Sequence, residues 1–291
     1  MIRVFPRKTN MTPNDELAFV GDPPLQRPPD QPVRVSVTFT WDIREGERLL
    51  RSWSRFYDDV QIGGPAFGDP GREFIPGLFL KKGVVLTSRG CKRNCRFCLV
   101  PKREGSVREL KIHDGYIIQD NNLLACSENH ILQVFNMLRQ QREPVRFPGG
   151  FDARLFQKDH ADLLRSIKLN EVWFARDGKG LRSLKKVARL LPEPEFSRDK
   201  KRCYVLVGFK GDSIQDAELR CREVFELGFL PFAMLYRSAT ETIRHSNYWS
   251  KFLRTWTRPA ATKAHMRGDE ETAQLNLFQK PTKGIDQCQK A

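Results

Sequence analysis

The sequence lacks a hydrophobic run long enough to cross a membrane. No stretch of about 18 apolar residues occurs among its 291 residues. The opening MIRVFPRKTN also lacks the apolar core and cleavage site of a secretory signal peptide. We therefore expect a soluble, cytoplasmic protein without a membrane partner.

Cysteine is scarce and unevenly placed. The seven cysteines are an odd number, and three of them lie within residues 91–98. This pattern excludes the paired disulfide framework of a small secreted domain and indicates a metal site in a reducing compartment. Hydrophobic residues make up 40% of the chain, which is enough for a large core without disulfides.

Acidic residues are too few to balance the basic ones. There are 35 Asp and Glu against 50 Lys and Arg, a formal net charge of +15. A surplus of this size indicates an acidic partner, which could be a nucleic acid, an acidic protein or a phosphorylated metabolite. The charge alone does not choose among these three.

The distribution of proline and of apolar residues divides the chain into four parts. The first is rich in proline and polar residues and predicts an extended arm. The second predicts a small β-α-β unit, the third a large α/β domain, and the fourth a polar, flexible tail. These parts cover residues 1–32, 33–79, 80–257 and 258–291.

Strand-like and helical runs alternate through the third part. This alternation predicts an α/β fold with a parallel sheet, either an open partial (β/α)6 barrel or a doubly wound sheet. In both folds the chemistry belongs at the carboxyl ends of the strands. The expected strands lie at residues 83–87, 116–118, 145–147, 172–175, 204–207 and 230–235, with helices at 131–141, 161–167, 181–191 and 214–227.

Cys91, Cys95 and Cys98 follow directly after the first of these strands. Three thiolates on one short loop can bind three irons of a [4Fe–4S] cluster and leave the fourth iron open for a substrate or cofactor. Zinc would need a fourth ligand, and His113 is poorly spaced for that role. Three unrelated core cysteines fit less well, because the loop between them is strongly charged and cannot be buried intact.

The C-x3-C-x2-C spacing, with Phe97 before the third cysteine, closely resembles the signature of the radical S-adenosylmethionine (SAM) superfamily. The resemblance implies a partial barrel in which Cys91, Cys95 and Cys98 hold the cluster and SAM chelates the open iron. It also implies an enzyme that cleaves SAM reductively to methionine and a 5′-deoxyadenosyl radical. In that family Phe97 would lie beside the adenine.

Three further segments, at residues 103–105, 119–125 and 149–154, resemble the subgroup of this superfamily that carries a cobalamin-binding domain. Many members have Gly-Gly-Glu where this chain has Asp-Asn-Asn, so that contact to the SAM amino group departs from the pattern. Ordinary turns and surface salt bridges are the alternative for each remaining position. The resemblance implies SAM contacts from Asp120, Asn121 and Asn122 to the amino group, Arg154 to the carboxylate, Asp177 to the ribose, and Val207 and Gly208 along the adenine.

Residues 33–79 resemble a remnant of the cobalamin-binding fold that precedes the barrel in this subgroup. Members that ligate cobalt from below commonly use a histidine, but no histidine precedes His113. The segment is also too short for five strands. We therefore expect a structural vestige and no bound cobalamin.

The resemblance also implies a reductant of the flavodoxin or ferredoxin type, whose negative charge would suit the basic residues around the cysteines. The same residues could bind nucleic-acid phosphates, and we expect a nucleic-acid-associated substrate slightly ahead of a small metabolite. The alternative is a non-catalytic nucleic-acid-binding protein stabilised by a structural metal.

Two features near the C-terminus bear on partners. Aromatic and basic residues alternate between Tyr248 and Arg258, which favours an amphipathic helix over a single-strand-binding surface. In the tail, Gln274, Leu275, Leu277 and Phe278 resemble the short peptide by which bacterial DNA-processing proteins bind the replication sliding clamp. A five-residue match can also arise by chance.

Overall fold

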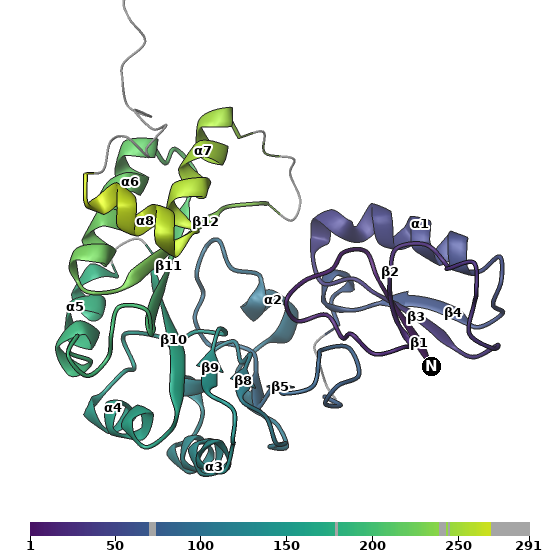
Figure 1. Ribbon diagram of the computed structural model, residues 1–291, viewed down its shortest axis with the longest axis horizontal. Coiled ribbons are helices and arrows are strands. Elements are labelled where there is room, and N and C mark those ends of the chain that lie inside the picture. Colours follow the sequence, from purple (N-terminus) through teal and green to yellow (C-terminus); the bar gives the residue numbers. More distant parts are fainter. Residues whose placement is uncertain (70–73, 178–179, 239–242, 244, 269–291) are drawn as a thin grey trace, which may run out of the picture.

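The computed structural model describes residues 1–69, 74–177, 180–238, 243 and 245–268. They form a mixed α/β protein with parallel sheets (Figure 1). None of the helices within these residues is long and apolar enough to cross a bilayer.

The main sheet has six strands, and every neighbouring pair is parallel. Their spatial order follows their sequence order without a reversal. All six predicted strands are confirmed, with bounds that move by a few residues. They are β5 (Val84–Val85), β8 (Ile117–Ile118), β9 (Val145–Phe147), β10 (Leu169–Arg176), β11 (Lys201–Val207) and β12 (Leu230–Leu235).

Helices between and after these strands bury one face of the sheet (Figure 1). Phe147, Phe174 and Val205 of the sheet are fully or almost fully buried in this core, with Phe135 from the helices. The four predicted helices are confirmed. The helices that follow β8 are α3 (Glu128–Arg139), α4 (Lys158–Arg165), α5 (Leu181–Leu190), α6 (Ile214–Glu226), α7 (Asn247–Trp256) and α8 (Pro259–Met266).

The crossover between β5 and β8 differs from the other crossovers. It carries the short helix α2 (Val100–Glu104) and an antiparallel ladder of β6 (Ser88–Arg89) with β7 (Arg108–Glu109). The three clustered cysteines lie in this crossover, between β6 and α2. A 3-10 turn, η3 (Leu123–Ala125), follows β8.

A second, smaller parallel sheet lies at the N-terminal end of the chain, with order β2-β1-β3-β4. The predicted strand-helix-strand unit is present, but it is only half of this sheet. Its elements are β1 (Ile2–Phe5), β2 (Ala18–Val20), β3 (Val33–Ser36), η1 (Thr40–Asp42), α1 (Ile43–Trp53), β4 (Val60–Gly63) and η2 (Pro65–Phe67).

The prediction of an extended arm over residues 1–32 is therefore wrong. β1 lies inside the small sheet, hydrogen-bonded to β2 on one side and β3 on the other. All four of its residues are buried. The prolines that suggested an arm lie in the loops after β1 and β2, where they interrupt no ladder.

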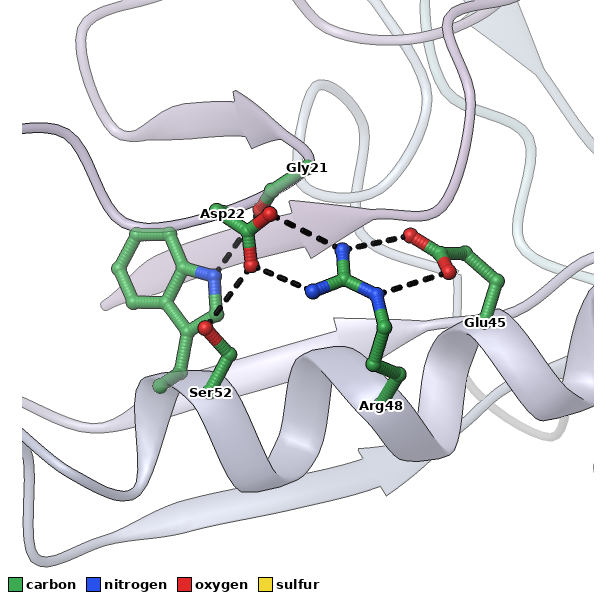
Figure 2. Close-up of polar contacts among 6 residues, drawn as sticks. Gly21, Asp22, Glu45, Arg48 and Ser52 are labelled. Atoms are coloured by element: carbon green, nitrogen blue, oxygen red, sulfur yellow. Dashed lines mark hydrogen bonds and ion pairs between the residues drawn. The ribbon is translucent and has the colours of Figure 1, made fainter.

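Hydrogen bonds and ion pairs of a polar cluster hold helix α1 against the segment after β2 (Figure 2). Arg48 lies between two carboxylates, donating to Asp22 at 2.7 Å and to Glu45 at 2.8 Å. Ser52 donates to the same Asp22 at 2.8 Å. Beside them the fully buried Trp53 donates its indole N–H to the Gly21 carbonyl at 3.1 Å.

The C-terminal segment is more ordered than expected. Residues 258–268 were predicted to be flexible, but most of them form α8, so that part of the prediction is wrong. Trp256 and Phe252 are fully buried and Trp249 nearly so, which confirms the preferred amphipathic helix. Glu218 of α6 accepts from Trp256 at 2.6 Å and bonds His265 of α8 at 2.8 Å.

Candidate functional site

Cys91, Cys95 and Cys98 are half-buried free thiols on the loop that leaves β6. The loop is folded tightly, with Cys98 N–H bonded to the Cys95 carbonyl at 3.0 Å and Cys91 N–H to the Gly105 carbonyl at 3.0 Å. Gly90, which precedes it, has φ of +87°. A Cβ there would lie 2.1 Å from the Ser106 carbonyl oxygen, so only glycine fits.

Burial raises the pKa of the Cys95 and Cys98 thiols. The Arg154 guanidinium acts in the opposite direction on the pKa of Cys95 and bonds its sulfur. Half-buried thiols of this kind are protonated at neutral pH until a cation replaces the protons.

The three thiols do not converge on one point. Within the described ranges no group of three or more His, Cys, Asp or Glu side chains is placed to hold a single metal ion. A tetrahedral zinc site needs such a group. Three thiolates are also the number that a [4Fe–4S] cluster with one open iron uses, and there each thiolate binds a different iron.

Asp120 supports the strand that leads into the cysteine loop. Its carboxylate is almost fully buried and accepts from Thr87 N–H at 2.7 Å, from the Thr87 hydroxyl at 2.6 Å and from the Ser88 hydroxyl at 2.8 Å. Burial raises the pKa of Asp120, while these donors act to lower it. The carboxylate is thus directed at the chain before Cys91.

The next two residues extend this support into the loop itself. Asn121 Oδ1 accepts from Gly90 N–H at 3.0 Å, and Asn122 Nδ2 donates to the Cys91 sulfur at 3.6 Å. Asn122 Oδ1 is buried and has no hydrogen-bond partner in the described part of the chain. An orphaned acceptor beside a cysteine sulfur is suited to an N–H group of a bound molecule.

Glu104 holds the other end of the loop. Its side chain is fully buried between two guanidinium groups, Arg89 at 2.7 Å and Arg103 at 2.5 Å. Because Arg89 precedes the cysteines and Glu104 follows them, the ion pair closes the loop at its base. A buried pair of this kind is costly to break, since either partner alone would be an uncompensated charge.

Asp152 joins the loop after β9 to the cysteine loop. It accepts from Arg93 at 2.9 Å and from Arg154 at 2.8 Å. The Arg154 side chain is half exposed, which leaves part of its guanidinium accessible.

Asp177, at the end of β10, faces the same region. Burial raises its pKa to about 6, against the opposing effects of Arg154, Arg176 and Arg220. The structure thus brings Arg154 and Asp177 to the side of the loop that carries Cys95.

The remaining predicted residues are Val207 and Gly208 at the end of β11, and Phe97 of the cysteine loop. The Phe97 ring packs edge-on against Phe209, with centroids 6.0 Å apart. The Val207 side chain is fully buried in the core, and its carbonyl accepts from Tyr236 N–H at 2.8 Å. Gly208 N–H is bonded to Asp212 at 2.8 Å.

No protein-family model matches the chain, and a search of curated proteins finds no match. The clamp-like residues Gln274, Leu275, Leu277 and Phe278 lie outside the described residues. Sequence reasoning gave no individual role to Thr87, Ser88, Glu104, Asp152 or Phe209. Two of the segments that resemble the subgroup, residues 103–105 and 149–154, contain Glu104 and Asp152, so the sequence carried a signal for these two.

Proposed function

We propose that the protein is a radical SAM enzyme that holds a [4Fe–4S] cluster through Cys91, Cys95 and Cys98. The observation that carries this proposal is a loop of three free thiols, braced at both ends, after the first strand of a sequentially ordered parallel sheet. When bound, such a cluster supplies one electron to SAM, which splits into methionine and a 5′-deoxyadenosyl radical.

The side chains around the loop have distinct roles in this proposal. Asp120, Asn121 and Glu104 position the cysteines. Asn122 offers its free Oδ1 to the amino group of SAM, and Arg154 offers the accessible part of its guanidinium to the carboxylate. Asp177 is placed to accept from the ribose hydroxyls when ionised.

We further infer that the main sheet is the wall of a partial (β/α)6 barrel. In a (β/α) barrel the strands follow one another around the wall in sequence order. In a doubly wound sheet the strand order reverses at the switch point between the two halves. The face away from the helices carries polar and aromatic side chains, including the Arg146–Glu171 pair and the stacked Trp173 and Tyr204. Such a face suits a lumen that binds a substrate.

The proposal is tested by anaerobic purification and reconstitution with iron and sulfide. About four irons with labile sulfide are expected per chain. With SAM and dithionite, chromatography should then detect 5′-deoxyadenosine. A flavodoxin or ferredoxin should replace dithionite as the electron donor.

The matched variants are Cys95→Ser and Cys126→Ser. Cys126 is half-buried but lies outside the loop, so its variant should retain iron and product, whereas Cys95→Ser should lose most of both. Undiminished product from Cys95→Ser, or one colourless zinc per chain, would overturn the proposal.

We also propose that the chain binds no cobalamin. The small sheet has four strands rather than the two predicted, so the argument from length is weaker than the sequence indicated. The argument from ligands stands, because residues 1–112 contain no histidine. Protein expressed with cobalamin available should therefore purify without a corrinoid absorption band.

A further inference from the structure

Five aromatic side chains form two groups, one at the cysteine loop and one at the small sheet, and Arg237 links them. Phe97 contacts Phe209, and Phe209 packs edge-on against Tyr236 with centroids 4.8 Å apart. The next residue, Arg237, lies 4.7 Å above the Trp41 ring, and Trp41 stacks on Phe39 at 4.7 Å. We call Phe39, Trp41, Phe97, Phe209 and Tyr236 the aromatic strip.

The aromatic strip is accessible along its length. Trp41 is 45% exposed, and the other four rings are half-buried. It crosses from the main sheet to the small sheet where the chain after β12 runs toward the start of α1 (Figure 1). The buried C-terminal tryptophans, which the sequence offered as an alternative stacking surface, do not share this exposure.

Basic residues are interleaved with these rings. Arg96, Lys210 and Arg237 are each adjacent in sequence to a ring of the strip and are exposed. In the described residues none of the three forms an ion pair with a carboxylate, and the nearby Asp212 and Asp42 are already paired with Arg220 and Arg7. Within the described part of the chain, the strip therefore carries three cations without a carboxylate partner.

The turn that carries Phe209 and Lys210 is conformationally demanding. Lys210 has φ of +26° and is the only non-glycine residue with positive φ in the described chain. It lies between Gly208 at +72° and Gly211 at +78°. A strained turn is costly, and this one holds the Phe209 ring against Phe97 and leaves the next side chain, Lys210, exposed.

From these observations we propose that the aromatic strip binds single-stranded nucleic acid and leads one base to the cysteine loop. Rings accept stacked bases of any sequence, and the interleaved cations neutralise the phosphates between them. A duplex hides its base faces and cannot use the rings. The inference deepens the proposed function by naming its substrate class, but binding itself needs no cluster.

Fluorescence anisotropy of the full chain tests this inference with labelled single-stranded DNA and RNA of about 16 nucleotides, the upper range of site sizes for one binding fold. A DNA duplex of the same sequence is the comparison. We expect either single strand to bind more tightly than the duplex. Affinity weaker than about 0.1 mM for both strands at low salt overturns the inference.

Trp41→Ala should weaken single-strand binding by about fivefold or more, the loss expected for one stacked base. Its matched control is Phe56→Ala, an exposed ring that also lies under an arginine, Arg27 at 4.0 Å. The control should bind as the unchanged protein does. An equal effect in both variants, or none in Trp41→Ala, overturns the inference and leaves the strip to another partner, such as an acidic reductant.

The cations are tested by the salt dependence of binding. Lys210→Gln and Arg237→Gln should each reduce the slope of log affinity against log salt by about 0.7, the value for one phosphate contact on a single strand. Lys158→Gln, at an exposed lysine of α4, should leave the slope unchanged. An unchanged slope in the two strip variants as well would overturn the inference.

The two proposals fail separately. Iron, sulfide and SAM cleavage without strip-dependent binding would overturn only the inference. Strip-dependent binding by a chain that holds no iron would overturn only the proposed function.

Discussion

At the residue scale, the raised pKa of Asp177 predicts that the stability of the protein depends on pH. Its pKa is raised from the ordinary 3.8 to about 6 in the folded protein, chiefly by burial. The folded state therefore binds a proton that the unfolded state has already lost in this range. Its contribution makes the free energy of unfolding fall as pH rises from about 4 to about 6, by roughly 3 kcal/mol, and level off above.

Urea denaturation across this range checks the prediction. Asp177→Asn should remove this component of the slope, whereas Asn in place of the exposed Asp58 should not. Identical pH profiles for Asp177→Asn and the unchanged protein would contradict it.

The hydrogen bond from Asn122 to the Cys91 sulfur predicts that replacing Asn122 changes the reduction potential of the proposed cluster. Its amide donates to the Cys91 sulfur, and such a bond stabilises the more negative, reduced state. Asn122→Leu should make the potential more negative by roughly 40 mV, the equivalent of a hydrogen bond of about 1 kcal/mol. A redox titration followed by electron paramagnetic resonance measures this shift.

The control for Asn122 is the exposed Asn94 on the same loop. Asn94→Leu should retain the original potential at equal iron content. A potential unchanged in Asn122→Leu would mean that the amide does not act on the cluster.

Sequence reasoning identified the cysteines but not what positions them. The spacing of Cys91, Cys95 and Cys98 is local information, so one sequence is enough to notice it. The contact between Asp120 and Thr87 joins residues 33 positions apart and exists only because β5 and β8 pair. The role of Asp120 could not be inferred without that pairing.

At the element scale, β1 is a strand that the hydrophobic pattern of the sequence did not predict. The six strands of the main sheet were predicted because apolar runs there alternate with long helical runs. β1 and β2 have only four and three residues, and prolines surround them. β1 is a strand because it pairs with β3, and β2 because it pairs with β1; these pairings leave little trace in the two short sequences.

Because β1 lies inside the small sheet, we expect substitutions of its side chains to lower the stability of that sheet. Val4 is fully buried, so Val4→Ala should lower the free energy of unfolding of the small sheet by roughly 2 kcal/mol. Leu25→Ala, at a side chain that is 98% exposed, should change it by less than about 0.5 kcal/mol. Equal urea midpoints for the two variants would restore the arm interpretation.

At the scale of the whole molecule, the two sheets have separate hydrophobic cores. Among the described residues, the core of the small sheet contains eight buried hydrophobic residues, and that of the main sheet contains 34. A small core leaves less free energy after the entropy of folding is overcome. We expect the small sheet to unfold at a lower urea concentration than the main sheet.

Tryptophan fluorescence can separate the two transitions. Trp53 lies in the small core, whereas Trp249 and Trp256 lie in the large one. Trp41 belongs to the same part of the chain as Trp53, so the early transition should be lost from the fluorescence signal in a variant that carries both Trp41→Phe and Trp53→Phe. Superimposable transitions by fluorescence and circular dichroism would instead mean one cooperative unit.

The bonds that hold the cysteine loop also affect whether the protein stays folded without a bound cluster. Asp120, Asn121 and Glu104 hold the loop by bonds that the polypeptide makes with itself. A zinc finger, by contrast, unfolds when its metal is removed. If the proposed cluster were lost by oxidation, the polypeptide would therefore stay folded, and we expect iron, sulfide and a reductant to restore the cluster without a chaperone.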